Sequence, residues 1–348
     1  MPESSAFRIT QVNIRAASEA EYRAIYDLVR EANQEFEPDE PPHSFEEVLS
    51  EWHNVPPMHR PHRWLAWDGN RVAAQLQSGY NGESQDNLHL LDFFAYVRPE
   101  YRGRGLARML LPHLLELSRQ TGRHTLHSWS EEHIPSGEAF LTRLGAHKAL
   151  VGHENQLLLS ELNHDLMKNW LANAPRDGFE LGFWDGALPE AELETICELL
   201  EVMNTAPKGD LEIEDRRITP AMLRQWERAT EARGNKTWTA YVRERDSGRF
   251  AGYTEIYWSP RRPHLLYQQG TGVFPEFRGH GLGRWLKAAM LERILSELPE
   301  AKKIKTGNAD SNAPMLKINY ELGFRPHRAN ASWQLKAEGL EAYLSRHP

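Results

Sequence analysis

A twelve-residue segment occurs twice in this chain, and it constrains the fold more than any other feature of the sequence. VRPEYRGRGLAR occupies residues 97–108 and VFPEFRGHGLGR occupies residues 273–284, with eight identities at an offset of 176 residues. Leu144-Gly145 and Leu322-Gly323 recur at nearly the same offset. Chance does not account for such matches, so the sequence indicates an internal duplication. It predicts two domains, at residues 1–170 and 171–348.

Helices and strands are expected in the same order in both copies, without the strict rhythm of a doubly wound sheet. In the first copy, Ser18 and Ser44 are candidate caps of helices near 18–34 and 44–53, and a hairpin turns at 68–70. Closing strands are expected to complete each copy from its own residues. The fold class predicted for each domain is a mixed, mostly antiparallel α/β sheet flanked by helices. In the second copy we expect strands near 178–184, 236–243, 249–258, 264–273 and 302–308, and helices near 189–203, 219–233, 281–297 and 312–322.

The repeated segment leads from an apolar strand through a glycine loop directly into a helix. Glycines let successive backbone N–H groups turn toward one concavity, and the helix start adds partial positive charge. With Arg102 and Arg278 leading the loops, this pattern predicts a phosphate or pyrophosphate site. Glycines that only cap a tight turn are the alternative, which the duplication disfavours. A Rossmann loop, and with it a nicotinamide oxidoreductase, is opposed by Arg108 and Arg284 at the third glycine position.

Both loops resemble the R/Q-x-x-G-x-G/A motif of the GNAT N-acyltransferase superfamily, and the tandem arrangement is similar to that of mycothiol synthase-like two-domain acetyltransferases. The resemblance implies acetyl-CoA, or another acyl-CoA, as co-substrate, with its pyrophosphate on the loop N–H groups. It also implies that strand-end backbone groups bind the pantetheine amide and polarise the thioester. The implied cofactor-binding residues are Val97, Arg102, Gly103, Arg104, Gly105, Leu106 and Ala107 in the first copy, and Val273, Arg278, Gly279, His280, Gly281, Leu282, Gly283, Asn308 and Asn312 in the second.

The two copies differ in the segment that resembles the family's second motif, which flanks the pantetheine arm. NADSNAPMLKINYELGF at 308–324 resembles it closely, whereas SWSEEHIPSGEAFLTRLGA at 128–146 has lost the asparagines. We therefore expect the first domain to be degenerate and non-catalytic, and the second domain to be catalytic.

Glu255 is the candidate general base, because an amine that arrives as an ammonium must lose a proton. It stands on a strand beside the expected cleft, with Tyr257 and Trp258 nearby. A solvated carboxylate on the outward face is the open alternative, since alternation along a strand can place Glu255 on either face. Asp92 is the acidic counterpart expected in the first copy.

The candidates at the leaving group are Asn319 and Tyr320. The family often has a tyrosine four residues before the glycine of Leu-Gly-Phe, where it protonates the thiolate. This chain has Asn319 there, and Tyr320 lies one residue later, about 100° further round the helix. The first copy has Leu141. Neither candidate is assigned as general acid.

Charge and composition exclude several classes of binding partner. Forty-nine acidic residues against 41 Lys and Arg give a formal charge of −8, the wrong sign for a nucleic-acid partner. No apolar run approaches the roughly 20 residues of a membrane span, and MPESSAF lacks a secretory signal, so we expect a cytoplasmic protein, monomer or homodimer. No metal is expected, because His59/His62 and His124/His127 have no further ligands clustered with them.

The predicted function is transfer of acetyl from acetyl-CoA to the primary amine of a small molecule, by direct attack in the second domain. The excess of acidic residues favours a cationic amine as the acyl acceptor. A non-catalytic acyl-CoA sensor or interaction protein is the alternative, which the missing tyrosine would allow.

Overall fold

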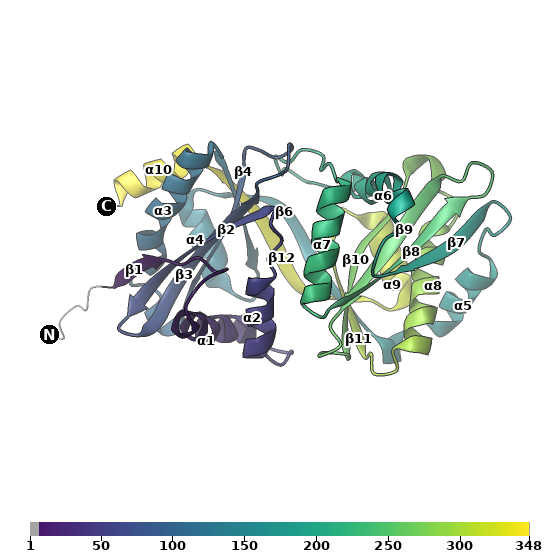
Figure 1. The fold of residues 1–348 in the computed structure, drawn as a ribbon, viewed down its shortest axis with the longest axis horizontal. Helices are drawn as coiled ribbons and strands as arrows, with labels where there is room; N and C mark the ends of the chain where they lie inside the picture. The colour runs from purple at the N-terminus through teal and green to yellow at the C-terminus, as the bar shows by residue number, and fades with distance from the viewer. Residues whose placement is uncertain (1–6, 348) are drawn as a thin grey trace. The chain divides into compact units, whose positions relative to one another are not determined.

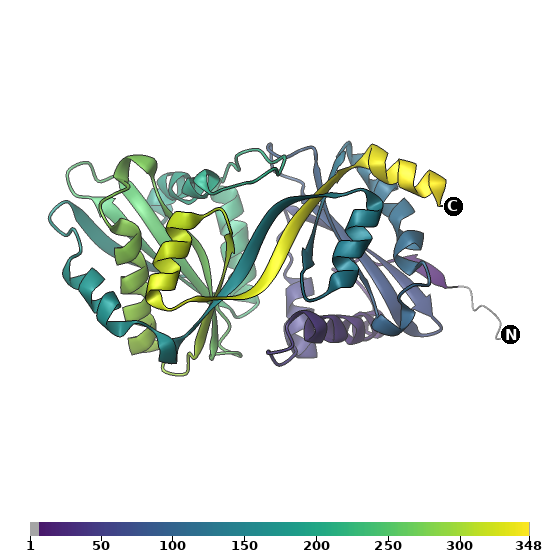
Figure 2. The same ribbon diagram turned by 180° about the vertical axis from the view of Figure 1, so that it is seen from behind.

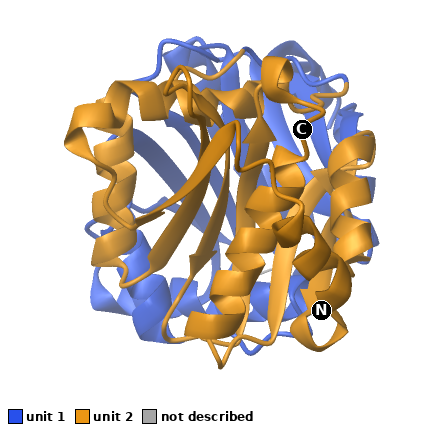
Figure 3. Cartoon of the chain, turned by 90° about the vertical axis from the view of Figure 1, so that its right-hand side faces the viewer, with its two compact units in different colours: residues 1–150, 210–214, 330–348 blue, residues 151–209, 215–329 orange. Residues whose placement is uncertain are grey.

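The structure, a computed structural model, describes residues 7–347. Its contacts divide the chain into two compact units (Figure 3). Unit 1 is drawn from residues 1–150, 210–214 and 330–348, and unit 2 from residues 151–209 and 215–329. Both are mixed α/β units with a mostly antiparallel sheet, as the sequence predicts.

Unit 1 has strands in the order β1-β2-β3-β4-β5-β12, antiparallel throughout except for the parallel pair β4 and β5 (Figure 1). One face packs on α1 and α2, and the other on α3, α4 and α10. Its elements are β1 (Arg8–Gln11), α1 (Glu19–Phe36), α2 (Phe45–His53), β2 (His59–Asp68), β3 (Arg71–Asn81), β4 (Leu90–Val97), η1 (Pro99–Tyr101), α3 (Leu106–Thr121), β5 (Thr125–Glu131), α4 (Pro135–Leu144), β12 (Arg325–Lys336) and α10 (Ala337–Arg346).

Unit 2 has strands in the order β6-β11-β10-β9-β8-β7, and its parallel pair is β10 and β11. One face packs on α6 and α7, and the other on α5, α8 and α9. Its elements are β6 (His147–Leu158), η2 (Leu159–Glu161), α5 (His164–Ala172), β7 (Phe179–Asp185), η3 (Glu190–Glu192), α6 (Leu193–Leu200), η4 (Glu201–Thr205), α7 (Pro220–Ala232), β8 (Lys236–Glu244), β9 (Phe250–Trp258), β10 (Leu265–Val273), η5 (Pro275–Phe277), α8 (Leu282–Glu297), β11 (Lys303–Ala309) and α9 (Ala313–Leu322).

The predicted caps and hairpin are confirmed. Ser18 and Ser44 each accept a hydrogen bond from the N–H of a glutamate three residues on, and that glutamate accepts one from the serine N–H. This reciprocal pair satisfies N–H groups that the first helical turn leaves without partners. β2 ends at Asp68 and β3 begins at Arg71, as the turn at 68–70 predicts.

Each sheet is completed by a strand from the other copy of the repeat. β6 and α5 follow the first copy along the chain, yet Gly152–Leu158 pair with Lys303–Ala309 of β11 in unit 2. β12 and α10 follow the second copy, yet Asn330–Lys336 pair with Thr125–Glu131 of β5 in unit 1 (Figure 2 shows β12 leading into α10). From the sequence, we expected each copy to close with its own strands. The exchange is possible because duplicated sheets present equivalent edges.

Candidate functional site

Both glycine loops have the backbone conformation that the phosphate-site prediction requires. Gly103 and Gly105 have φ of 79°, and Gly279 and Gly281 have φ of 87° and 77°. These values lie in the left-handed region, which residues with a Cβ rarely adopt. Gly105 and Gly281 are the N-cap residues of α3 and α8, so Leu106-Ala107 and Leu282-Gly283 form first helical turns. First-turn N–H groups have no intrahelical acceptor and can bind an anion.

The leading arginines fold back onto the strand that precedes each loop. Arg102 Nε donates to the Val97 carbonyl at 3.1 Å, and Arg278 Nε donates to the Val273 carbonyl at 3.0 Å. Their outer nitrogens differ: Arg102 Nη2 contacts Glu35 at 2.6 Å, whereas Arg278 Nη2 donates to the Thr205 hydroxyl at 2.7 Å. A carboxylate therefore compensates the charge of Arg102 but not that of Arg278.

The other two basic loop residues contact aromatic or backbone groups of their own loop. The Arg104 guanidinium lies over the Tyr101 ring, 5.1 Å from its centroid. His280 Nδ1 lies 3.2 Å from the Phe277 carbonyl. Both residues keep exposed surface beside the loop.

The parallel strands diverge just before each loop. β10 pairs with β11 only over Leu265–Tyr267, and β4 pairs with β5 only over Leu90–Asp92. The Phe274 N–H donates to Ala251 of β9, so the backbone groups of the preceding residue, Val273, point toward the diverging side. Arg98 N–H donates to Ala73 in the same way, which turns Val97 toward its own cleft. The expected splayed strands are therefore present in both units.

The clefts beside the diverging strands of the two units differ in the side chains that their strands contribute. In unit 1, a cavity of about 690 Å³ includes the loop residues 102–108, Val97, Phe94 and Trp129. The rings of Phe94 and Trp129 stack with centroids 4.9 Å apart. In unit 2, the register places Gly307 where unit 1 has Trp129, and a β-bulge containing Gln269 and Gly270 where it has Phe94. Two large rings in unit 1 are thus replaced in unit 2 by Gly307 and by the bulge of Gln269 and Gly270.

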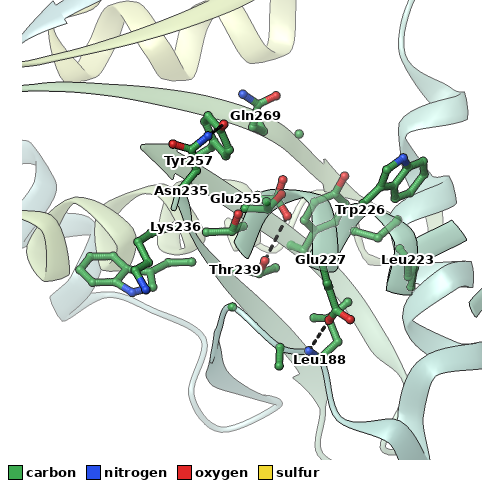
Figure 4. Close-up of a pocket in the computed structure, with 18 of the residues that line it drawn as sticks. Leu188, Leu223, Trp226, Glu227, Asn235, Lys236, Thr239, Glu255, Tyr257 and Gln269 are labelled. Carbon is green, nitrogen blue, oxygen red and sulfur yellow. Dashed lines mark hydrogen bonds between the residues drawn. The ribbon is translucent and has the colours of Figure 1, made fainter. Parts of the chain in front are cut away.

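A larger cavity, of about 1130 Å³, lies in unit 2 (Figure 4). Residues of β8, β9, α7 and η4 line it together with Gln269 and Gly270 of the bulge. Its walls contain aromatic rings and carboxylates: Trp226, Trp238, Tyr253, Tyr257, Trp258, Asp185, Glu201, Glu227, Glu231 and Glu255. The bulge therefore lies in the diverging strand, β10, and also forms part of the wall of this pocket.

Glu255 faces this pocket, where Figure 4 shows it beside Thr239. The Thr239 hydroxyl donates to Glu255 Oε2 at 3.2 Å. Desolvation raises the pKa of Glu255 to about 7, and the Thr239 hydrogen bond opposes part of that rise. Other pocket carboxylates have strong partners: Glu227 pairs with Arg224 and Asp185 with Arg293. No cation pairs with Glu255 among residues 7–347.

Strand register places Gln77 of unit 1 at the position of Glu255. Gln77 pairs with Arg63 of β2, as Glu255 pairs with Thr239 of β8. Asp92, the acidic counterpart expected from the sequence, lies on the fourth strand, β4, as expected, and contacts His127 Nδ1 at 2.8 Å. Asp92 therefore does not share the register position of Glu255, and its role as a base stays a prediction.

The asparagines of the second motif form a buried network. Asn319 is fully buried, donates to Asn308 Oδ1 at 2.8 Å and accepts from Lys287 Nζ at 2.7 Å. Asn312 is at the N-cap position of α9 without a side-chain cap bond, and Tyr320 is 39% exposed. The roles of these residues in catalysis and binding stay predictions. Lys287 was not singled out from the sequence, although its repeat position is Leu111 and a lysine there was a usable signal.

Within residues 7–347, no cluster of three or more His, Cys, Asp or Glu side chains is arranged to hold a metal ion. In the same part of the chain, no helix combines the length and apolar character needed to cross a membrane.

These features define a tandem acyltransferase fold, and comparison with known proteins agrees. The acetyltransferase (GNAT) family profile matches residues 22–146 and 194–324, once in each copy. The chain therefore belongs to the GNAT acetyltransferase family, whose members typically use acetyl-CoA. No curated protein matches the sequence in a search.

Three solved structures are similar to this chain. A tandem GNAT protein from the clavulanic acid biosynthesis pathway, without AcCoA, has 26% identity and a TM-score of 0.76 over 95% of this chain and 99% of that one. A GCN5-related N-acetyltransferase from Sphaerobacter thermophilus has 17% identity and a TM-score of 0.64, over 94% and 96%. A GCN5-related glucosamine N-acetyltransferase region of a fungal multi-domain β-N-acetylglucosaminidase has 11% identity and a TM-score of 0.64, over 95% and 38%. The last two show the fold alone.

Proposed function

We propose that this chain is an acyl-CoA-dependent N-acetyltransferase that transfers acetyl from acetyl-CoA to the primary amine of a small molecule, with the chemistry in unit 2. The observation that carries the proposal is Glu255, a carboxylate without a cation partner on the wall of an aromatic pocket. Its pocket adjoins the bulge of a strand that diverges from its neighbour. Unit 1 has an amide, Gln77, in that position.

Glu255 is suited to take a proton from an ammonium because its raised pKa, about 7, lies close to the working pH. The amine then attacks the thioester carbonyl carbon, a C–N bond forms, and the C–S bond breaks with its electron pair on sulfur. The Val273 N–H would stabilise the developing oxyanion. The N–H groups of residues 278–283 would hold the pyrophosphate of the co-substrate.

The acceptor is expected to be a cationic amine. The carboxylates of the pocket give it negative potential. One face of Trp226 and one face of Trp238 are already covered by the guanidinium groups of Arg216 and Arg293. Arg216, Arg233 and Lys236 also line the pocket, so an acceptor with an anionic group as well as an amine would find opposite charges there.

Release of free thiol tests the proposal, measured with acetyl-CoA and a panel of cationic amines. Release with at least one amine, lost in Glu255→Gln and retained in Gln77→Asn, is the expected result. The Gln77→Asn variant is the matched control, because it alters the same register position in unit 1. Equal activity of the Glu255→Gln and wild-type proteins would overturn the assignment of the base.

A second candidate function, acyl-CoA binding without transfer, is favoured for unit 1 by the stacked rings of Phe94 and Trp129. These rings occupy the positions that the glycines and the bulge occupy in unit 2. If coenzyme A binds tightly but no thiol is released with any amine of a broad panel, this candidate describes the whole chain and the transferase proposal fails.

A further inference from the structure

Lys287 of α8 is a buried cation without an acidic partner. Only 2% of its surface is exposed, and its Nζ donates to Asn319 Oδ1 at 2.7 Å. No carboxylate pairs with it among residues 7–347. The ammonium also lies over the Phe324 ring, 5.1 Å from its centroid. Burial of an unpaired ammonium is costly, so this lysine demands an explanation.

The hydrogen bonds of Lys287 lead to the edge of the cleft in unit 2. Asn319 Nδ2 donates a hydrogen bond to Asn308 Oδ1, at 2.8 Å. Asn308 follows the last β11 residue that pairs with β10, Lys305, so it lies where the strands have separated. An asparagine amide has two N–H donors, and Asn308 takes one of them. The ammonium polarises the Asn319 carbonyl, which strengthens the remaining N–H as a donor.

Unit 1 shows that the fold does not need this polar network. The repeat places Leu111 at the position of Lys287 and Leu141 at the position of Asn319, and both leucines are buried in the apolar core of unit 1. Two leucines therefore fill the same place at no electrostatic cost. The lysine and the asparagine occur in the unit that also has Glu255.

We infer that Lys287 is a positioning residue for the leaving group: through Asn319 it directs positive potential into the cleft of unit 2, where the thiolate of coenzyme A departs. This inference rests on the proposed function. In that reaction the C–N bond forms, the C–S bond breaks with its electron pair on sulfur, and the ammonium proton passes to Glu255. Lys287 keeps its proton throughout.

Two other cations on the elements around Lys287 have acidic partners. Arg284 of α8 contacts Glu321 of α9 at 3.1 Å, and Lys305 of β11 lies 3.7 Å from Glu154 of β6. Desolvation lowers the pKa of Lys287 to about 7, so an anion in the cleft would favour its charged form.

Titration of the thiol of bound coenzyme A tests the inference, with thiolate absorbance as the signal. The Gly105→Asp change is included in all proteins so that only unit 2 presents an unobstructed loop. With Lys287 present, the bound thiol should have a lower pKa than free coenzyme A. Lys287→Met should raise it by about one unit, a tenfold change in acid dissociation, and should lower kcat by at least tenfold with little change in KM. Glu255→Gln should leave the thiol pKa unchanged, because it acts at the amine.

The double variant Lys287→Leu/Asn319→Leu controls for folding, because it installs the leucine pair that unit 1 already contains. It should fold, bind coenzyme A and show the same raised thiol pKa. An unchanged thiol pKa in Lys287→Met and in the double variant would overturn the inference and leave the proposed transferase intact. Absence of coenzyme A binding by unit 2 in the parent protein would overturn both.

Discussion

The indole ring of Trp129 stacks on the phenyl ring of Phe94, with centroids 4.9 Å apart and planes 9° from parallel. Phe36 of α1 packs against the same indole, at a centroid distance of 5.1 Å. The corresponding place in β11 is Gly307, where an added Cβ would meet no heavy atom within 4 Å. Aromatic side chains therefore fill this space in unit 1, whereas the equivalent space beside Gly307 in unit 2 is open.

Gly307→Trp should block transfer. Its φ lies outside the left-handed region, so a side chain is tolerated by the backbone. An indole there would fill the open space beside the diverging end of β10, and thiol release should fall by on the order of 100-fold, the scale of misplaced reacting groups. Calorimetry should show coenzyme A affinity within a few-fold of wild type. The reciprocal change, Trp129→Gly, should not make unit 1 active, because Gln77 cannot accept a proton. Unimpaired turnover by Gly307→Trp would show that the thioester follows another path.

The pH profile of kcat/KM should report Glu255. Its carboxylate form is the base, and desolvation places its pKa at about 7. The rate should therefore rise about tenfold per pH unit below that value. Above it, deprotonation of Lys287, whose pKa is also about 7, should lower the rate again. In Glu255→Gln this rise should disappear, provided that the pKa of the amine acceptor lies well above the range measured. A profile with an inflection near 4.5 in the wild-type protein would contradict the buried position of this carboxylate.

Folding stability should also depend on Glu255, but it should fall with rising pH, whereas the rate rises. The pKa of Glu255 is higher in the folded than in the unfolded chain, so its protonated form favours folding and that contribution is lost as pH rises through 7. Glu255→Gln should thus stabilise the protein at pH 8 by roughly 1–3 kcal/mol and change little at pH 4. Denaturant titration at the two pH values measures the difference. Equal effects at both would indicate a carboxylate with its ordinary pKa.

Asp substitutions in the two glycine loops should separate the units. Gly281 and Gly105 have positive φ, so each change adds backbone strain and a negative charge at a candidate phosphate site. Gly281→Asp should abolish both acetyl transfer and one coenzyme A binding event. Gly105→Asp should remove only binding to unit 1. Loss of turnover in a folded Gly105→Asp protein would reassign the chemistry to unit 1.

The two leaving-group candidates should respond differently to substitution. Asn319 is buried and hydrogen-bonded to Lys287 and Asn308. Tyr320, the next residue of α9, is 39% exposed. We expect Asn319→Leu to lower kcat more than Tyr320→Phe does. A larger loss in Tyr320→Phe would identify the tyrosine as the proton donor. Circular dichroism checks that both variants retain the fold.

Local sequence signals predicted the elements around the site well. The helix expected at 281–297 is α8, Leu282–Glu297, and the strand expected at 264–273 is β10, Leu265–Val273. The helix expected at 189–203 is instead a short α6, Leu193–Leu200, between two 3₁₀ turns. The exchange of β6 and β12 had no local signal, because strand pairing depends on which sheet edge is available, and both copies offer the same kind of edge.

The site was predictable only where residue type carried the chemistry. Glycines with arginines pointed to the loops, and a lone acid on a strand pointed to Glu255. Its orientation could not be predicted, since alternation permits either face of a strand. The contrast between Trp129 and Gly307 depends on register between distant strands. The bulge at Gln269 and Gly270 also shifts the pairing of β10 with β9 by one residue. Such relationships emerge only from the assembled sheet.

The exchange of β6 and β12 has a consequence for how the protein is made. Unit 1 needs Asn330–Lys336 beside β5, so its sheet lacks that strand until residue 336 has left the ribosome. Until then β5 presents unpaired backbone groups, a state that invites association with other chains. A gene fragment that ends near residue 170 would carry β6 but no β12. Neither half of the chain therefore carries every strand that completes its own unit.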